Sequence, residues 1–183
     1  MYFYRCIIDS PEKEANVIFD IDQIKQALEN LKSVDFLKDI ETEVSKSYDV
    51  KNHWFDNDKK ISTIPYAERN GIYIYTKRDE EILYIGKGEY DSGGGIGFQS
   101  CSHLGAATRN SEVMFENHQW KNETPDKDKE EMEEIKRIIA TGDFLIWTIP
   151  VKPEHFTSLI EVYLQTFCIY ISGELPKLNK RIG

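Results

Sequence analysis

Gly71-Ile72-Tyr73-Ile74-Tyr75-Thr76 and Ile82-Leu83-Tyr84-Ile85-Gly86 are the two stretches of this sequence that decide its fold. Both are rich in isoleucine and tyrosine, which favour β-strands, and the charged residues 77–81 between them predict a solvated turn. Side chains alternate between the faces of a strand, so Tyr73 and Tyr84 can share one face of the hairpin. On the hairpin alone, packing is the simpler explanation for these tyrosines.

The residues after the hairpin predict helices and one more strand. Residues 126–141 have an amphipathic helical pattern that Gly142 ends, and Phe144 to Val151 is apolar and β-branched, as expected of a third core strand. Glu154 to Ile171 is a largely apolar helix. The sequence thus predicts an α+β fold: a small, three-stranded, mainly antiparallel core sheet flanked by helices.

The N-terminal third predicts an α/β extension. Residues 1–19 are expected to form two strands, and residues 22–46 to form helix, divided near Ser33, with Asp20 or Asp22 as the N-cap. We therefore divide the chain into an extension, residues 1–66, and a main domain, residues 67–183. The extension is expected either to cover the core or to serve DNA specificity or dimerisation.

Composition indicates a folded protein in a reducing compartment. The 183 residues are 40% hydrophobic, and no stretch approaches the length of a membrane span. Three scattered cysteines show no zinc-binding spacing, so we expect a cytoplasmic protein without a structural zinc and without a membrane association.

The two tripeptides Gly71-Ile72-Tyr73 and Tyr84-Ile85-Gly86, ten residues apart, resemble the signature of the GIY-YIG nuclease family. The resemblance extends over about residues 65 to 183. In that family a later helix carries a metal-binding glutamate, to which Glu161 corresponds, and an asparagine follows near the domain end, as Asn179 does here. The resemblance implies a DNA endonuclease, most like a stand-alone type II restriction endonuclease, that depends on Mg²⁺ or Mn²⁺.

The resemblance also implies roles for individual residues. Glu161 would bind the metal ion, because Mg²⁺ prefers oxygen ligands. Tyr73 would act as general base or orient the attacking water, and Tyr84 would hold the water or the phosphate. Lys87 would contribute positive charge and contact nucleic acid, and Asn179 would contact nucleic acid, orient Glu161 or close the domain. Cleavage of both strands would imply a homodimer.

One position departs from the family pattern. The expected helix Phe98 to Thr108 carries His103, which would relay a proton or bind phosphate, but Gln99 stands where the family has its catalytic arginine. Glutamine lacks the charge and the bidentate geometry of arginine toward phosphate. Arg109 is a poor substitute because it lies about 15 Å further along a helix, although it is a candidate contact for nucleic acid.

Gln99 has two possible explanations, and the net charge of the chain suggests a third possible function. Either a cation such as Lys87 or Arg78 replaces the arginine, or the chain is slow or inactive and binds nucleic acid or a protein partner without cutting. The net charge of −9 opposes DNA binding at long range, so binding requires a localised basic face. The same acidity supports a regulatory protein with no nucleic-acid role.

Overall fold

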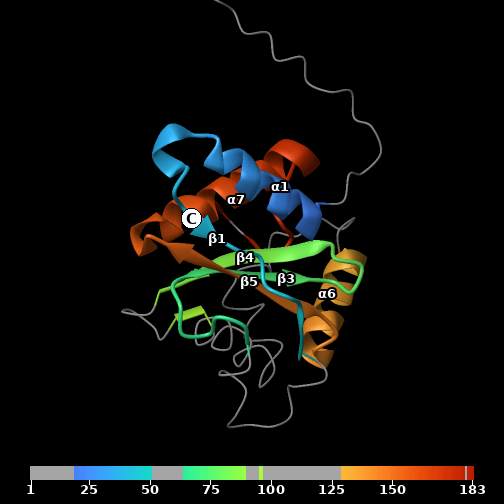
Figure 1. Cartoon of the computed structure of the whole chain (residues 1–183). Coiled ribbons are helices and arrows are strands. Elements are labelled where there is room, and N and C mark those ends of the chain that lie inside the picture. Colours follow the sequence, from blue (N-terminus) through green and yellow to red (C-terminus); the bar gives the residue numbers. More distant parts are fainter. Residues whose placement is uncertain (1–18, 51–63, 90–94, 97–128, 180) are drawn as a thin grey trace, which may run out of the picture.

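The computed structural model describes residues 19–50, 64–89, 95–96, 129–179 and 181–183 (Figure 1). Their strands join one antiparallel sheet in the order β1-β5-β3-β4, and β2 also pairs with β5. The strands are β1 (Glu41–Thr42), β2 (Tyr48–Asp49), β3 (Gly71–Thr76), β4 (Ile82–Gly88) and β5 (Leu145–Lys152). Helices flank this sheet, so the expected α+β class is confirmed.

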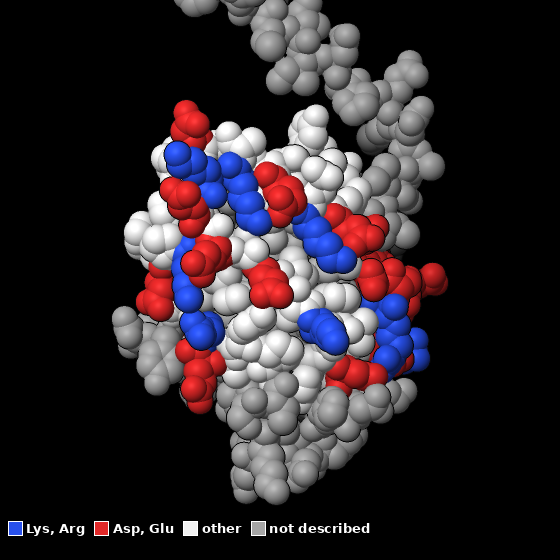
Figure 2. Space-filling model, viewed as in Figure 1, with Lys and Arg blue, Asp and Glu red and all other residues white. Residues whose placement is uncertain are grey.

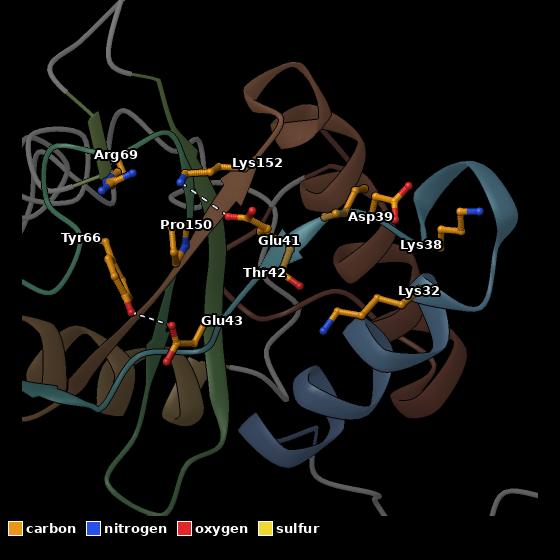
Figure 3. Close-up of a pocket in the computed structure, with 11 residues that line it drawn as sticks. Lys32, Lys38, Asp39, Glu41, Thr42, Glu43, Tyr66, Arg69, Pro150 and Lys152 are labelled. Carbon is orange, nitrogen blue, oxygen red and sulfur yellow. Dashed lines mark hydrogen bonds and ion pairs between the residues drawn. The ribbon is translucent and has the colours of Figure 1, made fainter.

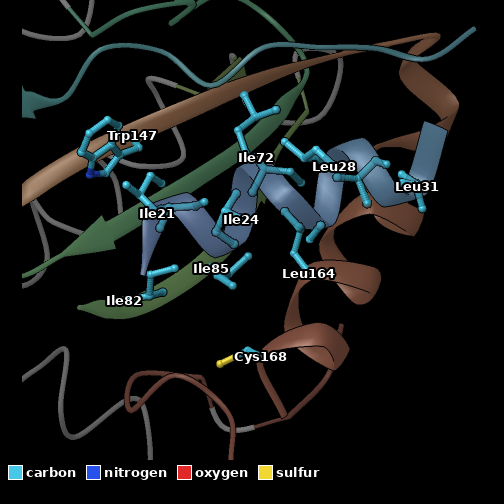
Figure 4. Packing of buried hydrophobic residues seen from close by; sticks show 14 of the residues in the cluster. Ile21, Ile24, Leu28, Leu31, Ile72, Ile82, Ile85, Trp147, Leu164 and Cys168 are labelled. Carbon is cyan, nitrogen blue, oxygen red and sulfur yellow. The ribbon is translucent and has the colours of Figure 1, made fainter. Parts of the chain in front are cut away.

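Two helices cover one face of the sheet (Figure 1). They are α1 (Ile21–Lys32) and α7 (Thr157–Ser172), and apolar side chains of both share a buried cluster with Ile72, Ile85 and Ile149. Figure 4 shows Ile24 and Leu28 of α1 between the sheet and Leu164 of α7. The Tyr163 hydroxyl of α7 also donates to the Ala27 carbonyl at 3.0 Å. The part of the extension that contains α1 therefore shares the core of the main domain.

Local sequence explains where α1 begins and where α7 ends. Asp20 accepts hydrogen bonds from the backbone of Asp22 and Gln23, and the Gln23 side chain accepts from the Asp20 backbone, which completes a capping box. The prediction of Asp20 as an N-cap is thus confirmed. Helix α7 ends at Gly173, whose φ of 83° is a left-handed conformation that glycine adopts without strain.

The opposite face of the sheet packs on α6 (Lys129–Thr141). Ile135, Ile138 and Ile139 of this helix share a buried cluster with Tyr73 and Tyr75 of β3. Gly142 has a φ of 69° and donates to the Ile139 carbonyl, so it ends the helix as the sequence predicted. The expected third core strand and the last helix are also present, as β5 and α7, with the 3-10 turn η4 (Glu154–Phe156) before α7.

The second half of the helix predicted over residues 22–46 is wrong. After α1 the chain makes the 3-10 turn η1 (Asp35–Leu37) and then extends into β1, where Glu41 pairs with Lys152 and Thr42 with Val151. Pairing along the edge of β5 outweighs the local helical pattern, because it satisfies backbone groups of both strands. The segment predicted to be irregular, residues 47–66, likewise contains β2. The strands expected before residue 19 and the helix expected over 98–108 lie outside the described residues.

The outer edge of β4 is covered by side chains and backbone from the C-terminal part of the chain. Asn179 Oδ1 accepts from the Ile85 backbone N–H at 2.9 Å, and its Nδ2 donates to the Ile85 carbonyl at 2.8 Å. Gln165 Nε2 donates to the same carbonyl at 3.1 Å, and the Leu178 backbone N–H donates to the Leu83 carbonyl at 2.8 Å. An edge strand otherwise presents unpaired groups to other chains, so this cover closes the sheet.

None of the helices that the structure describes combines the length and the apolar composition needed to cross a membrane.

Replacing Asn179 should weaken the fold at the β4 edge. Asn179→Ala removes two hydrogen bonds and leaves the Ile85 N–H without that partner, so we expect the free energy of unfolding to fall by about 1–3 kcal/mol. Urea unfolding measures the change. Asn30→Ala is the matched control, since the exposed Asn30 side chain accepts from the exposed Gln26 side chain, and it should change stability by less than about 0.5 kcal/mol. Equal effects of the two substitutions would contradict the structural role of Asn179.

Cys168 should be an unreactive thiol in the folded protein. It is 2% exposed, and burial raises the pKa of its thiol to about 11. In the unfolded chain the pKa of this thiol lies nearer its ordinary value, so folding opposes its ionisation. The free energy of unfolding therefore falls as the pH rises above that ordinary value. In a chain with Cys6→Ser and Cys101→Ser, we expect a thiol reagent at about pH 8 to label Cys168 only after denaturant is added. Rapid labelling of the native protein would contradict this.

Candidate active site

The predicted tyrosine pair forms because of the hairpin register. Tyr75 pairs directly with Tyr84, and Tyr73 pairs with Gly86, so Tyr73 and Tyr84 are diagonal neighbours on one face. The ring centroids of Tyr73 and Tyr84 are 5.7 Å apart, and those of Tyr75 and Tyr84 are 5.4 Å apart. The site therefore contains a cluster of three tyrosines, of which the sequence analysis singled out two.

Gly86 makes room for the Tyr73 hydroxyl. A Cβ atom at Gly86 would lie 2.8 Å from Tyr73 Oη and 2.5 Å from Tyr84 Cε1, distances that real side chains do not adopt. The bare backbone of Gly86 thus lets the phenol of Tyr73 reach over β4 toward the outer edge of the sheet. The glycine of the second tripeptide is required by close packing, not by an unusual φ angle.

Glu161 approaches this edge from α7. It belongs to the buried stripe of the helix and is 6% exposed, and its carboxylate accepts a hydrogen bond from the Lys87 backbone N–H. Burial raises the pKa of Glu161, while the charge of Lys87 and the hydrogen bond lower it and Glu89 raises it. The charge of Glu161 in turn raises the pKa of both Tyr73 and Tyr84. These effects place Glu161, Lys87 and the two tyrosines in one cluster.

Lys87 carries the positive charge of this cluster. Its ammonium group donates to Ser158 Oγ at 2.7 Å and pairs with Glu89 at 3.0 Å. Ser158 lies one turn before Glu161 on α7, so the same helix positions the carboxylate and anchors the lysine. The partly exposed Lys87 side chain faces solvent between these contacts.

The two phenols are protonated at neutral pH. Burial raises the pKa of Tyr73 well above its ordinary value, and its neighbours Tyr75 and Tyr84 add to the increase. Burial also raises the pKa of Tyr84, whereas a hydrogen bond from Tyr73 lowers it. The hydroxyl groups of Tyr73 and Tyr84 are thus hydrogen-bonded to each other. Tyr73 is fully buried, whereas Tyr84 is partly exposed and is the phenol of the pair that a ligand can reach.

The remaining predicted residues divide into three groups. Asn179 lies at the same edge of β4, but both polar atoms of its amide bind the Ile85 backbone, which matches the expectation that it closes the domain. Arg78 lies at the turn of the hairpin, at the opposite end from Lys87, and its guanidinium group binds Asp49 and Asp143. The suggestion that Arg78 replaces the family arginine is therefore wrong. Gln99, His103 and Arg109 lie outside the described residues.

Sequence reasoning missed several residues of the cluster. Ser158 and Gln165 could have been found, because they lie three residues before and four residues after Glu161 and so share its face of the helix. Tyr75 could have been found from the alternation of β3, since it follows Tyr73 by two residues. Glu89 carries no sequence signal of its own, because acidic residues are common in this chain.

Chemically, the cluster offers groups that suit an anionic substrate and a hard cation. A buried carboxylate, two neutral phenols and an ammonium group meet at the edge of one strand, and perturbed ionisable groups of this kind are frequent at functional sites. Comparison of the chain with protein-family models, with curated proteins and with solved structures found no match in any of the three.

A methyl group at Gly86 should disturb the tyrosine cluster. We expect Gly86→Ala to lower the free energy of unfolding by about 1–3 kcal/mol and to change the near-ultraviolet circular dichroism of the tyrosines, because the Cβ atom displaces Tyr73 and Tyr84. The control is a double-mutant cycle with Tyr84→Ala, in whose background Gly86→Ala should be less destabilising. Unchanged stability and an unchanged tyrosine spectrum for Gly86→Ala would contradict the packing described above.

Proposed function

We propose that this chain is a Mg²⁺-dependent DNA endonuclease of the GIY-YIG type, most like a stand-alone restriction endonuclease that acts as a homodimer in the cytoplasm. One observation supports the proposal above the others. Tyr73 and Tyr84 from the hairpin meet Glu161 from a helix far along the sequence, with Lys87 beside them. The family resemblance named these four residues from the sequence alone, and their proximity is what a shared chemical task requires.

The donor chemistry at Glu161 fits Mg²⁺ or Mn²⁺. Mg²⁺ takes oxygen ligands, keeps several waters and is commonly held by one or two carboxylates together with substrate phosphates. Glu161 offers a buried carboxylate, and Glu89 lies close enough to affect its pKa. Among the described residues, no three or more His, Cys, Asp or Glu side chains are placed so that together they could hold a metal ion, and a Mg²⁺ site of this kind does not need such a group. The bound cation would stabilise the negative charge that develops on the phosphate.

Hydrolysis of a phosphodiester involves two bond changes and two proton movements. The oxygen of a water molecule bonds to phosphorus, the bond from phosphorus to the leaving oxygen breaks, the water loses a proton and the leaving oxygen gains one. Glu161 would bind the cation, and the Lys87 ammonium group would contact a non-bridging phosphate oxygen. Tyr84, the more exposed phenol, would hold the water or the phosphate by a hydrogen bond.

The raised pKa of Tyr73 favours one of its two expected roles. A buried neutral phenol that is hydrogen-bonded to Tyr84 is suited to orienting that side chain and the attacking water. Acting as a general base would require Tyr73 to ionise beside Tyr84 and near Glu161, which burial and the negative charge oppose. We therefore assign Tyr73 the positioning role.

One observation favours a second candidate function, a GIY-YIG module that binds nucleic acid or a protein partner without cutting. Within the part of the chain that the structure describes, Lys87 is the cation of the cluster, and Arg78 is held by Asp49 and Asp143 elsewhere. With Gln99 at the arginine position, transition-state charge would be less well stabilised, and one such donor is worth about 100- to 1,000-fold in rate.

Cleavage of supercoiled DNA in Mg²⁺ and in Mn²⁺ tests the proposal. The parent chain should cut slowly, Gln99→Arg should cut faster, and Glu161→Gln should lose about a hundredfold or more, because it removes the charge that binds the cation. Glu133→Gln is the matched control, since it makes the same charge change at an exposed glutamate of α6 and should cut as the parent does.

The outcomes separate the candidate functions. Equal cleavage by the parent and Glu161→Gln would sink the assignment of the site. DNA binding without cleavage by any variant, Gln99→Arg included, would favour the binding module. Absence of both binding and cleavage at low salt would remove both nucleic-acid functions and leave the regulatory protein.

A further inference from the structure

A second cluster of basic side chains surrounds a groove at the opposite edge of the sheet. The groove has a volume of about 530 Å³ and lies between the end of α1, η1, β1 and the end of β5 (Figure 3). Four cations from four separate segments line it, together with three acidic residues and the exposed Tyr66. The cations are Lys32, Lys38, Arg69 and Lys152.

Two of these cations, Arg69 and Lys152, approach each other. In Figure 3 their side-chain nitrogens face one another beside Pro150, at the end where β5 leaves the sheet and β3 enters it. The side chain of Arg69 makes no hydrogen bond or ion pair with any other described residue. Like charges held toward one another are unfavourable unless an anion lies between them, so this arrangement suits an anionic ligand.

The backbone holds Arg69 firmly in place. Its N–H donates to the Tyr66 carbonyl at 2.9 Å, and its carbonyl accepts from the Ile96 N–H at 3.0 Å. The next residue, Asn70, accepts from the Val151 N–H through its carbonyl, which ties this loop to β5 one residue before Lys152. The two cations are thus attached to neighbouring, hydrogen-bonded backbone segments, and little ordering is needed before they bind.

The acidic residues of the groove leave this pair accessible. Glu41 lies 3.5 Å from Lys152, but the two side chains are 75% and 52% exposed, and an exposed pair of this kind contributes about 0–1 kcal/mol. Glu43 accepts a hydrogen bond from the Tyr66 hydroxyl at 2.9 Å, which in Figure 3 lies at the far end of the ring from Arg69. A phosphate group can therefore replace Glu41 as the partner of Lys152 at small cost.

The position of the pair relative to the candidate active site suits an extended anionic ligand. Gly71 pairs with Gly88 on one side and with Pro150 on the other, so Lys87 and the pair lie at the same end of the sheet. Two strand spacings and about three residues separate them, which gives about 14 Å. That distance is the rise of about four base pairs at 3.4 Å each. The alternation of side chains places Lys87 on the face of the sheet that carries α7, and Lys152 on the opposite face. A nucleic-acid strand that contacts both must therefore cross this end of the sheet.

We propose that Arg69 and Lys152 form a second phosphate-binding point, over which the substrate strand passes after it leaves the Tyr84, Lys87 and Glu161 cluster. The inference rests on the proposed nuclease function, and it names the surface along which the nucleic acid lies. Phosphate contacts supply most of the affinity of proteins for nucleic acid, and a chain with a net charge of −9 must obtain them at specific points.

The salt dependence of DNA binding tests this surface. In the full chain carrying Glu161→Gln, binding of a fluorescent DNA duplex is measured between about 50 and 200 mM salt. The logarithm of the binding constant falls linearly with the logarithm of the salt concentration. Adding Arg69→Ala and Lys152→Ala should make this slope less steep by about 1.8, since each lost phosphate contact changes it by about 0.9. In the cleaving chain, the same pair should raise KM and leave kcat nearly unchanged.

The control is the pair Lys25→Ala and Lys136→Ala. It makes the same change in net charge at the exposed Lys25 and the partly exposed Lys136, which pair with Asp22 and Glu133, and it should leave the slope unaltered. Because Arg69 and Lys152 are exposed, their variants should keep the circular dichroism spectrum and thermal midpoint of the parent. Arg69→Lys should restore part of the slope, as it keeps the charge.

The possible results distinguish this inference from the proposed function. If the parent binds and cuts DNA while the Arg69 and Lys152 variants match the lysine control, the proposed second phosphate-binding point is wrong and the proposed nuclease function is retained. If the parent neither binds nor cuts DNA, both are overturned. If inorganic phosphate alone binds through Arg69 and Lys152 while the DNA slope is unchanged, the groove is a site for a free anion instead of a nucleic-acid strand.

Discussion

The hydrogen bonds along the outer edge of β4 are the constraint on which the rest of the structure depends. Leu83, Ile85 and Lys87 turn backbone groups away from β3, and these groups need partners if the edge is to be closed. Asn179 pairs with Ile85 as a neighbouring strand residue would, while Gln165 and Glu161 of α7 bind Ile85 and Lys87. The contacts that close the sheet therefore also bring the carboxylate of α7 to the tyrosines of the hairpin.

Closing the edge does not by itself explain a glutamate at position 161. A glutamine there could accept the same hydrogen bond from the Lys87 N–H, much as Gln165, one turn later, serves the edge without a charge. The carboxylate is instead buried at a cost that raises its pKa, and its charge raises the pKa of both nearby phenols. A buried charge is normally paired or bound to a cation. The proposed cation site would explain why residue 161 carries a charge, whereas its contact with the Lys87 backbone helps to close the sheet.

Sequence patterns predicted the parts of this fold that local chemistry determines. The hairpin, the Asp20 cap and Gly142 follow from strand alternation, helix capping and the left-handed conformation of glycine. The helix predicted through residue 46 was wrong because β1 pairs with β5, and a partner so distant in sequence leaves no local signal. Likewise the alternation of side chains in β3 and β4 was enough to place Tyr73 and Tyr84 together. The partners of Arg78 could not be predicted in this way, because only the tertiary structure brings Asp49 and Asp143 beside it.

The acidic residues of this chain affect how the basic residues at one end of the sheet can bind an anion. Lys87 pairs with Glu89 at 3.0 Å, and Lys152 lies 3.5 Å from Glu41, so each of these cations already has an exposed acidic neighbour. Such pairs weaken long-range attraction to any polyanion, because their fields largely cancel. Figure 2 shows basic and acidic side chains intermixed in this way over the face that it draws. Such pairs are also easily exchanged, since an exposed pair contributes little stability and a bound phosphate releases counterions. A nucleic acid would then gain affinity only where its phosphates match both points, so the same acidity that weakens nonspecific attraction would favour strands of the correct geometry.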